Sequence, residues 1–195
     1  MIDLAADPFD LFATWFDQAC QSELADPNAM TLATADGRGR PSARIVLLKG
    51  WDRQGFVFYT NLESRKSREI EENARVALLF HWKSRKRQIR IEGDASPVTA
   101  AEADDYFASR PRMSRIGAWA SDQSRPLAER AELEQRLERT VARFAEQEIP
   151  RPPHWSGWRV APRAIEFWED RDFRLHDRAV FTRDGEAWST TRMYP

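Results

Sequence analysis

Residues 29–61 read AMTLATADGRGRPSARIVLLKGWDRQGFVFYTN, and this stretch decides the fold class. Met30–Ala35 and Pro41–Lys49 are mainly apolar or β-branched segments on either side of an Asp36-Gly37 turn, which is the pattern of a β-hairpin. Gly55–Asn61 follows as a third strand. Because no helical pattern separates these strands, the sequence predicts an antiparallel sheet.

A helix is expected before the hairpin. Asp7-Pro8 combines an N-cap residue with proline at the first helical position, and the helix should run to about Ala25. Apolar side chains recur at helical spacing, at Phe9, Phe12, Phe16, Ala19 and Cys20. Cys20 is the single cysteine, so it forms no internal disulfide, and its place in this pattern predicts a buried thiol.

The rest of the chain adds helices and strands. Helices are predicted at Ser64–Asn73, from Thr99 to near Arg110, and over Arg125–Gln147 with Leu127, Leu133, Leu137 and Val141 among its apolar positions. Strands are predicted at Val76–Trp82, Gln88–Ala95, Trp158–Trp168, Arg174–Thr182 and Trp188–Met193. The basic run Lys83–Arg87 should form a solvated hairpin tip. These elements predict one α+β domain over residues 1–195, mainly β, with a closed or split antiparallel barrel and flanking helices.

Composition and motifs argue against several classes of function. Thirty basic and thirty-one acidic residues leave a net charge of −1, which gives no sign of nucleic-acid or membrane-surface binding. The N-terminus lacks the features of a signal peptide and no stretch approaches a membrane span, so a cytoplasmic location is expected. Gly37-Arg38-Gly39 lacks the third glycine of a dinucleotide loop. His81, His154 and His176 are scattered, so no metal site is expected.

Two segments carry cations and hydroxyls in positions that suit phosphate. Ser64-Arg65-Lys66-Ser67 opens a predicted helix, where free backbone N–H groups add to the side-chain cations. A capped surface helix is the alternative. Tyr106, Arg110 and Ser114 recur every four residues, so a helical path would align a phenol, a guanidinium and a hydroxyl. Pro111 interferes with that path, and an exposed helix end is the alternative.

The strand RIVLLK is bracketed by two cations, Arg44 and Lys49. Strand alternation directs their side chains to opposite faces. A bulge or a subunit interface would be needed for both to serve one cleft.

Arg174–Arg178 lies in a predicted strand, where alternation directs Arg174, His176 and Arg178 to one face. Such a face favours an anion or another polar ligand. The alternative is a solvated face with Leu175 and Asp177 turned inward, although aspartate is a poor core residue.

Taken together, these segments resemble the pyridoxamine/pyridoxine 5′-phosphate oxidase family of FMN-binding split barrels. The resemblance runs from about Pro8 to Pro195. The matching motifs, in chain order, are RIVLLK at Arg44–Lys49, FYTN at Phe58–Asn61, SRK at Ser64–Lys66, SRPR at Ser109–Arg112, IGAWAS at Ile116–Ser121, QS at Gln123-Ser124, IEFW at Ile165–Trp168 and RLHDR at Arg174–Arg178.

The resemblance implies a homodimer that holds two FMN molecules at its interface, with the C-terminal strands, about residues 155–195, completing the active site. It assigns FMN contacts to Arg44, Ile45, Val46, Leu47, Leu48, Lys49, Tyr59, Thr60, Arg65, Lys66, Gln88, Gln123, Ser124, Trp168 and Arg178. It assigns the substrate phosphate to Lys49, Tyr106, Arg110 and Ser114, and the substrate ring to Arg174, Leu175 and His176, with Arg174 and His176 as catalytic residues. Family members often carry an N-terminal extension that helps to cover the active site, whereas about seven residues precede the first predicted helix here, so lid contacts are not carried over.

The activity that the resemblance implies is FMN-dependent oxidation of pyridoxine 5′-phosphate or pyridoxamine 5′-phosphate by O2, which gives pyridoxal 5′-phosphate and H2O2, and NH3 from the amine. Two alternatives remain. One is a flavin oxidase of the phenazine-biosynthesis type, which shares the barrel. The other is a non-catalytic carrier of FMN or pyridoxal phosphate.

Overall fold

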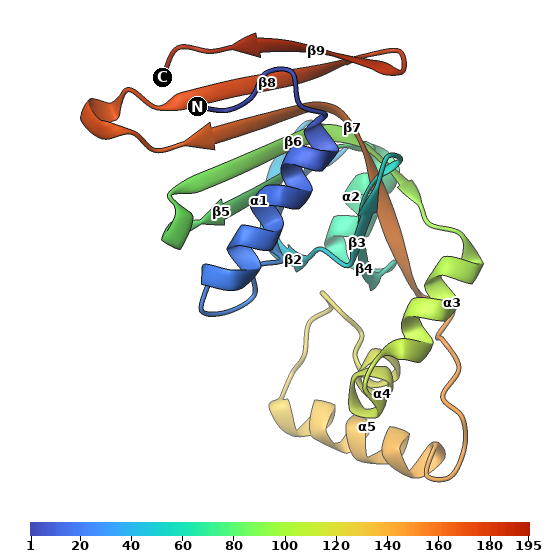
Figure 1. The fold of residues 1–195 in the computed structure, drawn as a ribbon. Helices are drawn as coiled ribbons and strands as arrows, with labels where there is room; N and C mark the ends of the chain where they lie inside the picture. Colours follow the sequence, from blue (N-terminus) through green and yellow to red (C-terminus); the bar gives the residue numbers. More distant parts are fainter.

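A curved antiparallel sheet dominates the computed structural model, which describes residues 1–195 (Figure 1). The strands are β1 (Ala29–Ala35), β2 (Pro41–Leu47), β3 (Gly50–Asp52), β4 (Gly55–Asn61), β5 (Arg75–Trp82), β6 (Arg87–Pro97), β7 (Trp155–Glu169), β8 (Asp177–Asp184) and β9 (Ala187–Arg192). Their order is β2-β1-β5-β6-β7-β4-β3, with β8 between β7 and β9. The predicted antiparallel α+β class and the first hairpin are therefore confirmed.

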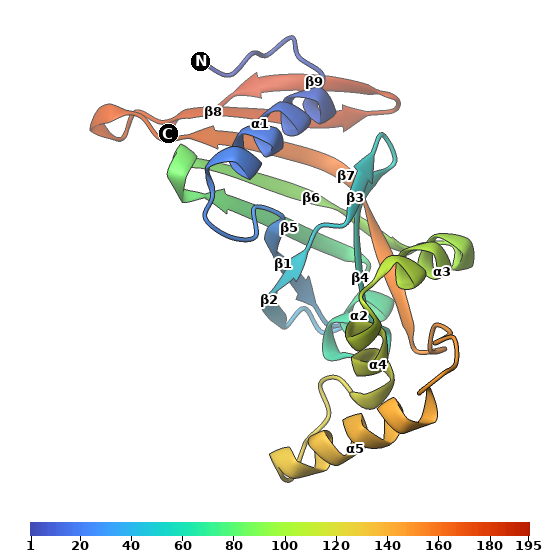
Figure 2. The ribbon, with the colours of Figure 1, turned by 60° about the horizontal axis from the view of Figure 1, so that its bottom comes forward.

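The helices are α1 (Pro8–Ser22), α2 (Arg65–Glu72), α3 (Ala100–Ser109), α4 (Arg112–Ala120) and α5 (Arg130–Arg143), with 3-10 turns η1 (Lys83–Arg85) and η2 (Asp172–Arg174). Two views show α3, α4 and α5 at one end of the sheet, away from β8 and β9 (Figures 1 and 2). The predicted cap of α3 is confirmed, because the Thr99 hydroxyl accepts from the Glu102 N–H while the Glu102 carboxylate accepts from the Thr99 N–H. None of the helices combines the length and apolar composition that crossing a membrane requires.

The long strand β7 forks the sheet. One edge of β7 pairs with β6, whereas the other edge pairs with β4 from Trp155 to Val160 and with β8 from Ala164 to Glu169. The β6–β7 register shifts between Glu92 and Gly93. A Cβ atom at Gly93 would lie 2.2 Å from the Ala161 carbonyl oxygen, so only glycine allows the two backbones to approach this closely. The fork places the two ends of β7 in different parts of the molecule.

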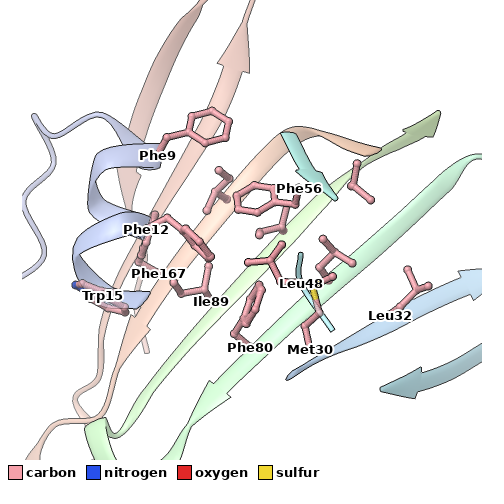
Figure 3. Packing of buried hydrophobic residues seen from close by; sticks show 14 of the residues in the cluster. Phe9, Phe12, Trp15, Met30, Leu32, Leu48, Phe56, Phe80, Ile89 and Phe167 are labelled. Carbon is pink, nitrogen blue, oxygen red and sulfur yellow. The ribbon is translucent and has the colours of Figure 1, made fainter. Parts of the chain in front are cut away.

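Helix α1 fills the concave side of the sheet. Its side chains Phe9, Phe12 and Trp15 point towards the strands, where Phe56 and Phe167 meet them (Figure 3). The Phe12 and Phe56 ring centroids are 4.9 Å apart with planes at 75°, a favourable edge-to-face contact. Phe12 is fully buried. Its truncation to alanine would cost about 3–5 kcal/mol, so α1 is a principal source of stability.

Several predicted details of α1 are wrong. The helix ends at Ser22 rather than near Ala25, because Glu23 adopts an extended backbone (φ −76°, ψ 138°). Cys20 is exposed instead of buried. The helix turns Phe12, Trp15 and Ala19 inward, and one further residue rotates the side chain by about 100°, which takes Cys20 towards solvent.

The region after α3 also differs from expectation. A single helix over Arg125–Gln147 is wrong, because α5 covers only Arg130–Arg143 and has no buried residue. Phe144 leaves the helical conformation and is buried against Trp119, with ring centroids 5.6 Å apart. The separate helix α4 and the three-residue strand β3 were not predicted. The basic tip is solvated only in part, because Arg87 lies 4.3 Å above the Trp15 ring.

Candidate functional site

The cleft lies between the β2 and β4 strands and the α3–α4 pair. Its volume is about 690 Å³. Stacked aromatic rings form one wall: Tyr59 lies 4.1 Å from Tyr106 and 5.4 Å from Trp155 between ring centroids. Gly157 makes room for this stack, since a Cβ atom there would lie 2.7 Å from the Tyr59 ring. The cleft therefore offers a flat apolar wall for a ring-shaped ligand.

The predicted set Tyr106, Arg110 and Ser114 meets in this cleft. The three residues do not share one helix, because α3 ends at Ser109 and α4 begins after Pro111. Arg110 lies between the two helices, with its Cζ atom 4.8 Å from the Trp155 ring centroid. Its Nη1 atom is buried and has no hydrogen-bond partner, and burial lowers the pKa of this guanidinium. A half-buried cation whose buried Nη1 atom lacks a partner is suited to bind an anionic ligand in the cleft.

Lys49 adds a second positive charge near Arg110. Its Nζ atom lies 5.9 Å from the Tyr106 ring centroid. The expected conflict between the faces of Arg44 and Lys49 does not arise, because β2 ends at Leu47 and alternation no longer applies at Lys49.

Lys66 supplies the cation at the other side of the cleft. Its ammonium donates to Thr60 Oγ1 at 3.0 Å, Ser64 Oγ at 3.1 Å and Gln123 Oε1 at 3.1 Å. These partners are all uncharged. Burial, assisted by the positive charge of Arg44, lowers the pKa of Lys66 to about 8. Like Arg110, Lys66 is a desolvated cation that an anion would stabilise.

Glu69 forms a buried polar network behind Lys66. Its carboxylate accepts from Thr34 at 2.5 Å and Ser42 at 2.6 Å, and pairs with Arg44 at 3.1 Å and Arg65 at 2.7 Å. Burial by itself would raise the pKa of Glu69, but the hydrogen bonds from these four side chains outweigh it and lower the pKa to about 2. Arg44 and Arg65, two of the predicted FMN-binding residues, are thus held by Glu69 and do not line the cleft.

The predicted site divides into two groups in space. Members that line the cleft are Ile45, Val46, Leu47, Lys49, Tyr59, Thr60, Lys66, Tyr106, Arg110, Ser114 and Gln123. Arg44 and Arg65 lie in the Glu69 network, Leu48 is in the core, and Ser124 is exposed with a positive φ of 69°. The remaining members, at the far end of β7, are Gln88, Trp168, Arg174, Leu175, His176 and Arg178.

This far group is built on neighbouring strands. Gln88 of β6 pairs with Trp168 of β7, which pairs with Arg178 of β8. The His176 ring lies 4.6 Å from the Trp168 ring. Arg178 pairs with the buried Glu166 at 2.7 Å. The group thus forms a second polar surface.

The predicted alternation over Arg174–Arg178 is wrong. Strand β8 begins only at Asp177, and Arg174 lies in η2 with a positive φ of 61°. Arg174 and Leu175 are exposed, the latter at 67%. Asp177 is buried although aspartate is a poor core residue, because it accepts from the Ile2 N–H and pairs with Arg192. His176 and Arg178 are still neighbours of Trp168, whereas Arg174 lies in the exposed turn that precedes β8.

A single chain separates the two groups widely. Strand β7 begins at Trp155 in the cleft and ends beside Trp168 and Glu169 in the far group. At about 3.3 Å per residue its 15 residues follow a path of up to roughly 45 Å, and two views show its ends well apart (Figures 1 and 2). A ligand of vitamin size cannot contact both groups of one chain.

Some residues of the site were missed by sequence reasoning. Trp155 and Asn61 line the cleft, and Glu69 anchors the network behind it. The spacing of Arg65 and Glu69, four residues apart in a predicted helix, was an available signal. The contacts of Trp155 with Tyr59 and of Glu69 with Thr34 join distant segments and had no local signal.

Solved structures define the class of the fold. The chain matches PhzG from Burkholderia lata, solved in complex with tetrahydrophenazine-1-carboxylic acid, with a TM-score of 0.93 at 34% identity over 99% of this chain and 95% of that chain. It also matches a pyridoxamine 5′-phosphate oxidase-related, FMN binding protein from Nostoc punctiforme, with a TM-score of 0.77 at 16% identity over 98% of this chain and 100% of that chain. The molecule is a split-barrel protein of this class.

The sequence comparisons specify the family within that class. The profile described as pyridoxamine 5′-phosphate oxidase matches residues 16–169, and the profile of the pyridoxine 5′-phosphate oxidase C-terminal dimerisation region matches residues 155–195. A pyridoxine/pyridoxamine 5′-phosphate oxidase of Gluconobacter oxydans is 64% identical over 100% of this chain and 98% of its own length. The chain belongs to the pyridoxamine 5′-phosphate oxidase family and is an oxidoreductase.

Proposed function

We propose that two copies of this chain form an enzyme that oxidises pyridoxine 5′-phosphate or pyridoxamine 5′-phosphate to pyridoxal 5′-phosphate. The alcohol reacts with O2 to give the aldehyde and H2O2. The amine also consumes water and releases NH3. FMN is the cofactor, and when bound it accepts a hydride from substrate C4′ and returns the electrons to O2.

One observation carries this proposal. Lys66 and Arg110 are desolvated cations in a single cleft, and neither pairs with a carboxylate. Two phosphorylated ligands, a flavin nucleotide and a vitamer phosphate, require two separate anion sites. The stacked wall of Tyr59, Tyr106 and Trp155 in the same cleft suits aromatic ligands.

The residues around Lys66 fit the FMN phosphate. Thr60 and Gln123 already contact the Lys66 ammonium and offer further polar atoms. The exposed side of β2, with Ile45 and Leu47, borders the same cleft. Arg44 and Arg65 would act from the Glu69 network, which keeps their positive charge near the phosphate.

The residues around Arg110 fit the substrate phosphate. Lys49, Tyr106 and Ser114 complete this subsite with an ammonium, a phenol and a hydroxyl. Phosphate binding there would hold the vitamer ring in the cleft and fix C4′ for hydride transfer. Positioning of this kind provides much of the rate enhancement when no covalent nucleophile takes part.

The far group would complete the site from a second copy. Gln88, Trp168 and Arg178 would contact FMN, and Arg174 and His176 would orient the substrate ring and stabilise charge as the hydride leaves. The wide separation of the two groups along β7 and the match of residues 155–195 to a dimerisation region both support this arrangement.

The match to PhzG supports a second candidate, oxidation of a reduced tricyclic phenazine acid. Purified protein would be mixed anaerobically with pyridoxine 5′-phosphate, pyridoxamine 5′-phosphate or tetrahydrophenazine-1-carboxylic acid, and flavin bleaching would be followed at its visible band. We expect bleaching by a vitamer phosphate and one H2O2 per product after air is admitted. Bleaching by the phenazine acid alone would favour the second candidate, and a flavin that none of them reduces would indicate a carrier.

A further inference from the structure

The orientation of His176 raises a chemical question that the proposed reaction leaves open. A neutral imidazole has one N–H group and one lone pair, so the nitrogen that carries the proton decides whether Nε2 donates or accepts a hydrogen bond. The partner of Nδ1 usually makes that choice. For His176, every protein hydrogen bond or ion pair of the ring is at Nδ1.

Two groups compete for Nδ1 of His176. The Asp170 Oδ1 atom lies 3.0 Å away in an ion-pair contact that is not aligned as a hydrogen bond, and its negative charge favours a proton on Nδ1. The Arg171 backbone N–H donates a hydrogen bond to Nδ1 at 3.3 Å, which favours a lone pair on that nitrogen. The carboxylate prevails because its full negative charge, 3.0 Å from an unprotonated Nδ1, would repel the lone pair there more strongly than one long, neutral hydrogen bond stabilises it.

Asp170 is itself held in place. Its backbone N–H donates to the Lys86 carbonyl oxygen at 2.9 Å, and the Lys86 ammonium lies 3.9 Å from its second carboxylate oxygen. Trp168 covers one side of the imidazole, and the His176 side chain is only 17% exposed. The imidazole therefore has little freedom to rotate, and Asp170 is fixed through its backbone although its side chain is 36% exposed.

We propose that Asp170 is a positioning residue for the oxidation, an inference that rests on the proposed function. It keeps the proton of neutral His176 on Nδ1, so that Nε2 presents a lone pair to a hydroxyl or amino group of the bound vitamer. Asp170 acts through His176 and does not touch the substrate. An Nδ1–H tautomer accepts a substrate proton or hydrogen bond at Nε2, whereas the opposite tautomer repels it.

The test is a nitrogen NMR measurement on the FMN-loaded protein together with its kinetics. The chain has three histidines, so the ¹⁵N signals of uniformly labelled protein can be assigned to His176 by comparison with His176→Gln. Spectra would be recorded at about pH 8.5, well above the ordinary imidazole pKa of about 6.5. The variants are Asp170→Ala, Asp170→Glu and, as a matched control in the same turn, Asp172→Ala, whose exposed side chain makes no hydrogen bond or ion pair with His176.

We expect the Nδ1–H pattern in the unaltered protein and in Asp172→Ala. In Asp170→Ala the Arg171 N–H is the partner left at Nδ1, so the proton should move to Nε2. Anaerobic flavin reduction should then slow about 10- to 100-fold, the size of effect seen when a group that orients a metal-ligating histidine is lost. The KM for the vitamer should change less than about threefold, since phosphate binding supplies most of the affinity. Asp170→Glu should restore both the pattern and part of the rate.

The proposal is overturned if His176 carries its proton on Nε2 in the unaltered protein, or if Asp170→Ala leaves the nitrogen pattern unchanged. An equal effect of Asp172→Ala would also overturn it, because the cause would then be general loosening of the turn. If no vitamer phosphate reduces the flavin, the proposed function fails, while the nitrogen spectra still decide the relation between Asp170 and His176.

Discussion

The Arg110 guanidinium stacks over the Trp155 indole, with Cζ 4.8 Å from the ring centroid, while its Nη1 atom is buried without a hydrogen-bond partner. The stacking positions the charge without neutralising it, because an aromatic face attracts a cation but removes no proton. Arg110 is therefore ready to bind an anion before any ligand arrives.

The first prediction concerns this residue. Arg110→Ala should raise the KM for either vitamer phosphate about 10- to 100-fold, which corresponds to the loss of one charged hydrogen bond worth about 1.5–3 kcal/mol. The rate of flavin reduction at saturating substrate should change little. FMN affinity, measured by quenching of flavin fluorescence, serves as the control. A large loss of FMN from this variant would contradict the assignment of Arg110 to the substrate phosphate.

The second prediction concerns pH and Lys66. The pKa of Lys66 is lowered to about 8, so its ammonium loses its proton as the pH rises through 8. The FMN dissociation constant should therefore be flat from pH 6 to 7.5 and increase above pH 8, by up to about tenfold per unit. A fluorescence titration from pH 6 to 9.5 measures this. Lys66→Arg remains charged throughout and should lack the rise; the same rise in this variant would place the titrating group elsewhere.

The third prediction concerns stability and Glu69. The folded pKa of about 2 lies below the ordinary 4.5, so the carboxylate stabilises the fold above pH 4.5, and this contribution is lost as the pH falls from 4.5 through 2. The shift corresponds to about 3 kcal/mol. Glu69→Gln should be destabilised by about this amount at pH 7, where Arg44 and Arg65 would lose their counter-charge.

Urea unfolding of both proteins between pH 7 and pH 3 would measure that difference in unfolding free energy, which should shrink towards the acid end. Glu71→Gln, on the exposed side of the same helix, is the matched control and should remain near the unaltered protein at every pH. A difference in unfolding free energy that stays constant with pH would show that Glu69 stabilises the fold through packing and not through its negative charge.

The fourth prediction tests whether each site uses two chains. Arg110→Ala and His176→Ala should each slow turnover at subsaturating substrate when alone. If Arg110 and His176 of one site come from different chains, a mixed dimer contains one intact site and one site with both changes. Random exchange of subunits should then restore about a quarter of the unaltered activity. Equal parts of the two variants would be unfolded together, refolded with FMN and assayed; activity no higher than the mean of the separate variants would show that Arg110 and His176 of different chains do not meet in one site.

Local rules predicted the elements well where the backbone is regular. The Asp36-Gly37 hairpin, the Thr99 cap and the strand around Phe58 each have a signal within a few residues, and each is found. The same rules failed at Arg174, because a positive φ ends the alternation that the rule assumes. They also failed for Cys20, where one residue of helical rotation separates core from solvent.

The candidate site was predictable in its residue types and not in its geometry. A cation and hydroxyl set indicated phosphate at Lys66 and Arg110, and both residues line the cleft. The Glu69 network was not predictable, because it forms only where α2 packs against β1 and β2, and no local pattern specifies that packing. His176 lies far from Arg110 because β7 is long. Sequence motifs give the order of residues along the chain and not the distances between them, so this separation could not be predicted.

The fork of β7 has a consequence for inactivation. In the proposed dimer each β7 begins in one catalytic centre and ends in the other, so both centres share the same two strands. Damage that unravels a single β7 would disable both centres together, leaving no half-active molecules. Heat inactivation should therefore remove activity and visible flavin in parallel, one whole dimer at a time.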